Sequence, residues 1–405
     1  MLCQFTFKNF KSYKNEVTLD LQATKASGFN ESLLQFAGDE EKFLPVSVIY
    51  GPNAGGKSNV LNAFGFVYSL VMNPVSLFKT SIRKPMAKWS TFAFDDVSRN
   101  AAAEFELFFR PNNEYEYKYS IKVLKNKIIE ENLYRRKIEV DCRTRITNVF
   151  KRNSNGIKLG ACINKQSINT EVNDKIPYLS FLAINYKLKP INIAIDWFER
   201  CYIRDYADPD TEQHILLADD AEFKENLIKL LNSVGINISN FDFIETPSKK
   251  EIYELFFDHT VNGRTFRLNA ELESAGTQKL FNILPLVLLV MSEGGVLVID
   301  ELDAKLHPKL LKYIVMLFKN PEINKKNAQL IFTSHDVSTL KSSVYRTDEV
   351  WFACKLADES SELYSLADIR DENNNHIQPS AAFDKQYLEG RYGADPYFQN
   401  MMDWK

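Results

Sequence analysis

The stretch that decides the fold is Gly51-Pro52-Asn53-Ala54-Gly55-Gly56-Lys57-Ser58. It matches the phosphate-binding pattern G-x-x-x-x-G-K-[ST] at every fixed position. The apolar run 46–50 comes before it, and a helical pattern follows from residue 57 to about residue 71. A buried parallel strand, a glycine-rich turn and a helix are the context that the pattern requires, so the sequence predicts an α/β fold built on a P-loop.

The residue types in this loop fit a nucleoside triphosphate. Gly51, Gly55 and Gly56 let the backbone curl until successive N–H groups point at phosphate oxygens, and the helix N-terminus faces the same anion. Lys57 places a positive charge at the β- and γ-phosphates, and the Ser58 hydroxyl is a ligand for Mg²⁺. We therefore predict ATP and Mg²⁺ as cofactors. The predicted binding set also includes Asn53, Ala54 and Asn59.

A second motif occupies residues 294–301, Gly-Gly-Val-Leu-Val-Ile-Asp-Glu. Four β-favouring residues that end in two carboxylates are typical of a central strand with a Walker B motif. Asp300 is predicted to hold the Mg²⁺, and Glu301 to orient and deprotonate a water, since positioning and charge compensation supply most of the catalysis in phosphoryl transfer. The alternative is a strand followed by a solvated acidic turn.

A histidine ends the next apolar run, 328–333, in the sequence Ser334-His335-Asp336. A lone histidine after a strand is more often structural than catalytic. Because this one follows the Walker B strand and ends what we expect to be the next strand, we predict that His335 is a catalytic sensor of the γ-phosphate.

A signature-like segment, Glu273-Ser274-Ala275-Gly276-Thr277-Gln278-Lys279-Leu280, lies between a predicted hairpin and the Walker B strand. Taken alone, it fits a plain helix start in which Ser274 is the N-cap residue of a buried apolar helix. Taken in order with the other motifs, it predicts that Ser274, Gly276 and Gln278 bind nucleotide.

The ordered motifs resemble those of the ABC-type ATPases of the SMC and RecF-like class. The chain is most similar to the shorter AbiLii/RloA-like ATPases of phage-defence operons, over residues 1–125 and 250–395. The resemblance rests on Asn9-Phe10-Lys11-Ser12, on 273–277, on Asp300-Glu301-Leu302-Asp303 with His307-Pro308, on 334–336 and on 387–394. Two features depart from the family pattern: no glutamine occurs in 89–96, and the signature is Ser-Ala-Gly-Thr-Gln.

The resemblance implies a P-loop NTPase of ABC-ATPase topology with an inserted α+β subdomain. The ATPase domain would comprise residues 1–112 and 251–405, and the insertion residues 113–250. It further implies that Lys11 and Ser12 lie at the nucleotide and that two chains close head to tail around ATP. The implied role is a sensor or scaffold that controls a separately encoded effector, a nuclease, in antiphage defence.

Charge leaves a nucleic-acid partner open. The 50 Lys and Arg residues against 53 Asp and Glu residues give a net charge of −3, so no global basic surface is expected. Residues 121–160 hold eleven basic and four acidic residues, a local net of +7, which predicts either DNA or RNA contact or a solvated face. The rival functions are a RecF-like DNA repair ATPase and, disfavoured by the strand-rich insertion, a transporter subunit.

The remaining sequence predicts a cytoplasmic protein with no membrane partner. Five scattered cysteines form no C-x-x-C pair, and the apolar run 280–291 is interrupted by Asn282 and Pro285. Residues 336–405 are too few for a further nuclease domain, so the effector is expected elsewhere. Alternation and periodicity predict strands around a turn at 11–15, strands at 103–109, 115–123, 127–134, 351–354 and 363–365, helices at 191–202 and 221–234, and a hairpin at 251–268.

Overall fold

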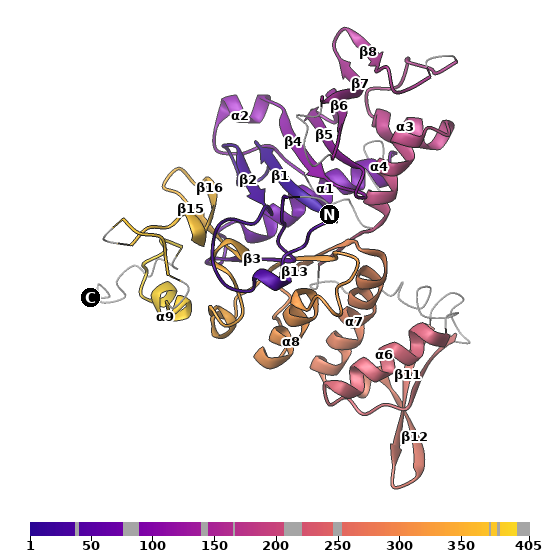
Figure 1. Ribbon diagram of the computed structural model, residues 1–405, viewed down its shortest axis with the longest axis vertical. Helices are drawn as coiled ribbons and strands as arrows, with labels where there is room; N and C mark the ends of the chain where they lie inside the picture. The colour runs from indigo at the N-terminus through magenta and orange to yellow at the C-terminus, as the bar shows by residue number, and fades with distance from the viewer. Residues whose placement is uncertain are drawn as a thin grey trace.

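The structure is a computed structural model that describes residues 1–36, 40–75, 89–138, 145–164, 167–205, 221–245, 253–371, 374–378 and 381–394. Three β-sheets and the helices between them make up the described part (Figure 1). The strands predicted in the first half of the chain are present with ends that differ by a few residues at most.

The first sheet is antiparallel, with strand order β2-β1-β4-β5-β6-β7-β8. Successive side chains along a strand point to opposite faces of the sheet. One face carries buried apolar side chains such as Phe5, Phe7 and Phe105, and the other carries polar side chains. Its strands are β1 (Leu2–Lys8), β2 (Val17–Asp20), β4 (Ala103–Phe109), β5 (Tyr115–Leu124), β6 (Lys127–Lys137), β7 (Thr147–Asn153) and β8 (Gly156–Leu159).

The second sheet has the order β16-β15-β3-β14-β13-β9, and every neighbouring pair except β15–β16 is parallel. The carboxyl ends of its parallel strands therefore meet at one edge, where the loops after β3, β13 and β14 come together. Its strands are β3 (Val46–Tyr50), β9 (Cys201–Asp205), β13 (Val296–Asp300), β14 (Gln329–Thr333), β15 (Val350–Lys355) and β16 (Ser361–Ser365).

The helix predicted at 191–202 is wrong at its C-terminal end. The helix α4 covers Lys189–Glu199, and residues 201–205 form β9, which pairs with β13 from Cys201↔Val296 to Asp300↔Asp205. The edge of β13 offers backbone hydrogen-bond partners that the local pattern does not reveal. The division of the chain at residues 113 and 250 remains a prediction. Strands on the two sides of each boundary pair with one another, β4 with β5 and β10 with β11.

The helix after the P-loop, α1 (Lys57–Met72), lies between the first and second sheets. On one side, the ring of Phe64 packs edge-on against Phe5, with 5.5 Å between centroids, and Phe66 lies 5.3 Å from Phe105. On the other side, the same core includes Ile331 of β14 and neighbouring apolar residues of β3 and β13. The helices α3 (Tyr178–Asn185) and α4 complete this layer.

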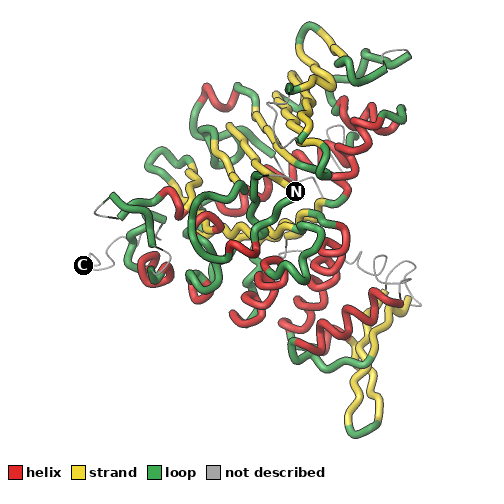
Figure 2. Tube along the Cα trace, in the orientation of Figure 1, coloured by secondary structure: helices red, strands yellow, loops and turns green. Residues whose placement is uncertain are grey.

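The opposite face of the second sheet is covered by α7 (Ala275–Glu293) and α8 (Pro308–Lys319) (Figure 2). In the described part of the chain, α7 is the one helix that is long and apolar enough to cross a membrane. Its residues Leu280, Ile283, Leu284, Val287 and Val290 are buried in the core, so packing against the sheet accounts for its apolar sequence.

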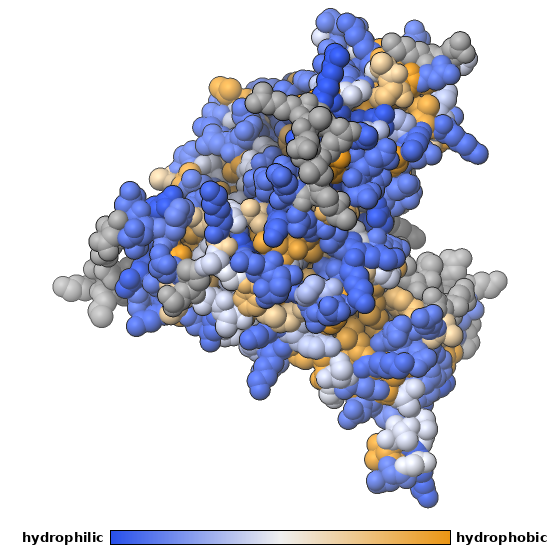
Figure 3. All heavy atoms as spheres, in the orientation of Figure 1, coloured by the Kyte–Doolittle hydropathy of each residue, from blue (hydrophilic) through white to orange (hydrophobic). Residues whose placement is uncertain are grey.

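A small lobe projects beside α7 (Figure 1). It consists of α6 (Ala221–Ser233) and a third sheet of β10 (Asn240–Glu245), β11 (Tyr253–Val261) and β12 (Arg264–Asn269), with the predicted turn at Asn262-Gly263. The ring centroid of Phe281 in α7 lies 5.0 Å from that of Phe241 and 4.9 Å from that of Phe257, so Phe281 joins the lobe to the core. A small apolar patch is visible near the tip of the hairpin, and larger apolar areas lie over the middle of the same face (Figure 3).

Short elements complete the described chain. They are α2 (Asp96–Asn100), α9 (Phe383–Leu388) and the 3₁₀ helices η1 (Asn30–Ser32), η3 (Ala270–Leu272), η4 (Val337–Thr339), η5 (Thr347–Glu349) and η6 (Leu366–Asp368).

Replacing Phe281 should loosen the lobe. Phe281→Ala removes a buried ring that contacts two lobe strands, and we expect it to lower the free energy of unfolding by about 3–5 kcal/mol, as measured by urea denaturation. Phe266→Ala on the hairpin is the control: its side chain is 56% exposed, and the change should stay within about 0.5 kcal/mol. Equal midpoints for the two variants would contradict this anchoring role.

Candidate nucleotide-binding site

The P-loop lies directly on the antiparallel strands at the end of the second sheet. A Cβ atom at Gly51 would come within 2.0 Å of the Ala353 carbonyl oxygen, and one at Gly55 within 2.6 Å of the same oxygen. Gly56 has φ +110°, and a Cβ there would lie 2.5 Å from the Ser361 hydroxyl. The neighbouring backbone and side-chain atoms therefore leave room only for glycine at these three positions, whether or not a phosphate is bound.

Lys57 is buried beneath this loop. Its ammonium donates hydrogen bonds to the carbonyl oxygens of Gly51 (2.8 Å) and Pro52 (3.0 Å). Burial lowers the pKa of Lys57, and the nearby carboxylates of Asp300, Glu301 and Asp303 act in the opposite direction. The lysine therefore sits within the electrostatic reach of the Walker B carboxylates.

The turn at Lys11 and Ser12 also lies beside the P-loop. The Asn59 side-chain amide and the Ser361 hydroxyl each donate to the Ser12 hydroxyl over 2.8 Å, and the Ser361 N–H donates to the Ser12 carbonyl over 2.7 Å. Lys11 has a left-handed backbone (φ +50°), and its N–H donates to Ser90 over 2.8 Å. The sequence did not predict that Ser361 lies at the P-loop, because nothing in the residues around Ser361 indicates this position.

The outer P-loop residues Asn53 and Ala54 are exposed, and Ala54 has φ +64°. Ser58 is half-buried on the first turn of α1, and Asp300 is half-buried at the end of β13. A hydroxyl and a carboxylate oxygen are ligands that fit Mg²⁺, which proteins hold through one or two carboxylates together with substrate phosphates. Close by in sequence, the Oδ1 atom of Asp303 is buried without a hydrogen-bond partner.

Thr333 connects the Asp300 carboxylate to the backbone of Glu301. Its hydroxyl donates to Asp300 and accepts from the Glu301 N–H over 2.7 Å. Glu301 has φ +52° and an exposed side chain. The N–H of His335, whose side chain is also exposed, donates to Asp303 Oδ2 over 3.1 Å. The structure thus brings the loops that carry Asp300, Glu301 and His335 together at one sheet edge.

The signature residues lie at the start of α7. Ser274 is its N-cap residue, and the hydroxyl accepts from the Thr277 N–H over 3.1 Å. The amide of Gln278 donates to the carbonyl oxygens of Glu273 (3.0 Å) and Glu271 (3.3 Å). A Cβ at Gly276 would lie 3.4 Å from the Lys305 carbonyl oxygen. The observed contacts of Ser274 and Gln278 are therefore local, and the Ser274 side chain is exposed.

Lys279, which the sequence argument did not single out, connects the signature helix to the Walker B loop. It is buried, and its ammonium donates to the Glu301 carbonyl oxygen over 2.8 Å. Burial lowers the pKa of Lys279 to about 8, although the carboxylates of Asp303 and Glu301 oppose this shift. The sequence offered one indication of this contact: Lys279 lies on the buried face of the predicted helix, directly after Gln278, and a buried basic residue needs a partner.

Several basic residues of 121–160 are engaged within the protein. Lys122 lies 2.9 Å from Glu104 and 3.6 Å from Glu130, and Arg152 is buried with a 2.7 Å hydrogen bond to the Ile176 carbonyl oxygen. The local charge predicted from the sequence is therefore partly neutralised by neighbouring strands.

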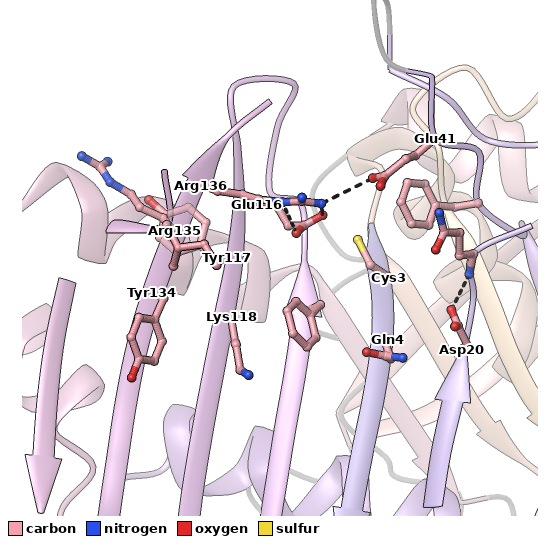
Figure 4. Close-up of a pocket in the computed structure, with 14 residues that line it drawn as sticks. Cys3, Gln4, Asp20, Glu41, Glu116, Tyr117, Lys118, Tyr134, Arg135 and Arg136 are labelled. Carbon is pink, nitrogen blue, oxygen red and sulfur yellow. Dashed lines mark hydrogen bonds and ion pairs between the residues drawn. The ribbon is translucent and has the colours of Figure 1, made fainter. Parts of the chain in front are cut away.

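A cavity of about 250 Å³ opens on the polar face of the first sheet (Figure 4). Arg136 lies at its rim and binds Glu116 through hydrogen bonds of 2.6 and 3.1 Å, with Glu41 3.6 Å away. The guanidinium is thus balanced by carboxylates. This arrangement does not favour an anion site at Arg136.

The sequence family described as "AAA domain, putative AbiEii toxin, Type IV TA system" matches residues 46–341, which include both phosphate-site motifs and the histidine. The chain belongs to this family. With the parallel sheet and the P-loop, this membership confirms the predicted fold class, an α/β P-loop NTPase of ABC-ATPase topology; the inserted α+β subdomain remains a prediction. It also supports ATPase activity at the general level.

Solved structures similar to this family member include an SMC head domain from Thermotoga maritima, with 15% identity, a TM-score of 0.44 and coverage of 90% of this chain and 98% of that one. Another is an Smc head domain with an extended coiled coil, bound to the C-terminal domain of ScpA, from Pyrococcus furiosus. It has 16% identity, a TM-score of 0.33 and coverage of 90% and 96%. No curated protein sequence matches this chain.

Lys279 should make stability depend on pH. Its folded pKa of about 8 lies below the ordinary lysine pKa of 10.5, so between these values the unfolded chain binds a proton that the folded chain lacks. The contribution of Lys279 to the free energy of unfolding therefore rises with pH across this window. We expect the urea midpoint of the wild type, minus that of Lys279→Met, to increase from pH 8 to pH 10.5. With Lys312→Met, on an exposed position of α8, the difference should stay constant. A pH-independent Lys279 difference would refute the assignment.

Proposed function

We propose that this protein hydrolyses Mg-ATP at composite sites formed by two chains arranged head to tail. The observation that carries the proposal is the convergence of the P-loop, the Walker B carboxylates and the loop that carries His335 at one edge of the second sheet. Lys57 is held in the loop by two carbonyl oxygens, and the charges of three carboxylates act on it.

Each residue has a distinct role in the proposed reaction. Ser58 and Asp300 would hold Mg²⁺, which would supply positive charge at the phosphates of ATP. Glu301 orients and deprotonates the attacking water, since its side chain is exposed just beyond the strand and its backbone is fixed by Thr333 and Lys279. His335 contacts the γ-phosphate. Phosphoryl transfer needs this positioning more than covalent chemistry from the protein.

The proposed dimer rests on the exposed start of α7. The N-terminus of this 19-residue helix is a positive pole, and Ser274 presents its hydroxyl there. The hydrogen bonds of Ser274 and Gln278 stay within residues 271–277. A second chain would supply the nucleotide phosphate that this helix end favours. Lys11, Ser12, Asn53, Ala54 and Asn59 would line the site on the P-loop side.

In the cell, we propose that the ATP-closed dimer controls a separately encoded effector, a nuclease, during phage infection, and that it acts in the cytoplasm. The family description, which names a toxin of a type IV toxin–antitoxin system, supports a role in such a pair. A RecF-like role on DNA has less support, because Lys122, Arg136 and Arg152 already have partners within the protein.

The proposed base can be tested by Glu301→Gln, which keeps the volume and a hydrogen-bonding group. Steady-state phosphate release at saturating Mg-ATP should fall by about 10²–10⁴-fold, the usual contribution of a general base, while ATP affinity is retained. Glu322→Gln, at an exposed position beyond α8, is the control and should keep the wild-type rate. A wild-type rate for Glu301→Gln would show that the base is misassigned.

The composite site can be tested by Ser274→Arg. The variant should bind ATP as a monomer but fail to dimerise with Mg-ATP in sedimentation measurements, because the arginine occupies the partner's nucleotide position. Ser292→Arg, near the other end of α7 and exposed, is the matched control and should dimerise. Mixing Ser274→Arg chains with Lys57→Ala chains should give mixed dimers in which at most one of the two composite sites is intact. Dimerisation and turnover of Ser274→Arg at wild-type levels would exclude the head-to-tail arrangement.

A further inference from the structure

The C-terminal motif that carries part of the family resemblance forms a compact aromatic structure, which we call the C-terminal cap (residues 383–394). Phe383 is fully buried, and the Tyr387 ring stacks on Phe352 of β15, with 5.5 Å between centroids and 11° between planes. The Tyr387 hydroxyl donates to the Ala394 carbonyl oxygen over 3.2 Å. The Tyr392 ring lies 5.3 Å from Phe352. These contacts fix the cap against the second sheet.

The cap also covers Tyr50, the last residue of β3 and the neighbour of the first P-loop glycine. The rings of Tyr50 and Tyr387 are 6.3 Å apart, and Phe352 is the direct strand partner of Tyr50. Tyr50 is only 1% exposed. A hydroxyl buried so deeply needs hydrogen-bond partners inside the protein.

Two partners of the Tyr50 hydroxyl belong to the segment 334–339, which we call the His335 loop. The hydroxyl donates to the Asp336 carbonyl oxygen and lies 3.3 Å both from this atom and from the Thr339 hydroxyl. The Thr339 hydroxyl also donates to the Asp336 carbonyl oxygen over 3.1 Å. The cap itself packs against η4, the turn that ends this loop. Tyr50 thus connects the end of β3 to the residue after His335.

We propose that Tyr50, held by the C-terminal cap, is a positioning residue that sets the placement of His335 for ATP turnover. This inference rests on the proposed ATPase function. Tyr50 is a positioning residue in this scheme, because its hydroxyl binds the backbone of Asp336, the residue after His335. Its hydroxyl fixes the backbone on the C-terminal side of His335, while the hydrogen bond from the His335 N–H to Asp303 fixes the histidine backbone itself.

The test separates the hydroxyl from the ring. Tyr50→Phe should leave ATP affinity unchanged and reduce kcat by about fivefold, the size of one net hydrogen bond. In a His335→Ala background, the same change should have no further effect on kcat. Tyr178→Phe is the matched control: it removes a hydroxyl that donates to the Asn169 carbonyl oxygen, in the α3 region, and should keep the wild-type rate.

The cap is tested by a pair of variants at Tyr387. Tyr387→Ala removes the ring over Tyr50 and should reduce kcat as Tyr50→Phe does. Tyr387→Phe keeps the ring and removes the hydroxyl that donates to Ala394, so it should keep a rate close to that of the wild type. A kcat loss with Tyr50→Phe that is equal with and without His335 would overturn the positioning role.

Hydrogen exchange gives a readout that does not depend on hydrolysis. The amides of Ser338, Thr339 and Leu340 are bonded within the His335 loop and should exchange faster in Tyr50→Phe and Tyr387→Ala than in wild type. Unchanged exchange overturns the coupling even if the enzyme is active. Faster exchange in a protein that hydrolyses no ATP would instead support the coupling and refute the proposed function.

Discussion

Burial of α1 between two sheets is the constraint on which the rest of the structure depends. The helix presents Phe64 and Phe66 to the first sheet, and the same core includes apolar residues of the second sheet. A helix enclosed on both sides cannot tilt without opening cavities, which cost several kcal/mol for each large side chain. The P-loop at its N-terminus is therefore fixed relative to both sheets before any nucleotide binds.

The P-loop is held from outside as well. The carbonyl oxygen of Ala353 approaches Gly51 and Gly55, while Ser361 approaches Gly56 and also binds Ser12. Strands from the last quarter of the chain thus form the floor under a loop near its beginning. Glycine is therefore required at these positions for two independent reasons. Phosphates need open backbone N–H groups, and the neighbouring strands leave no room for a Cβ atom.

The signature helix joins two parts of the molecule that would otherwise be separate. At its start, Lys279 binds the Glu301 backbone, so the Walker B loop and the helix share a contact. Two residues further, Phe281 packs into the lobe sheet, and His259 Nε2 of the lobe lies 2.9 Å from the Glu273 carboxylate, just before the signature serine. A displacement of the lobe would therefore reach the start of α7 directly, which places the lobe in position to influence the proposed composite site.

The sequence alone determined the elements whose chemistry is local. The P-loop, the Walker B strand and the hairpin at 251–268 follow from glycine spacing, apolar runs and alternation, and the structure confirms those elements. Tertiary structure alone decided the rest. Residues 201–205 became a strand because β13 offered an open edge, and Ser361, Lys279 and Tyr50 acquired their partners from segments distant in the chain. Local periodicity encodes which face of an element is apolar. It does not encode which distant backbone meets that element, since this depends on how the whole core packs.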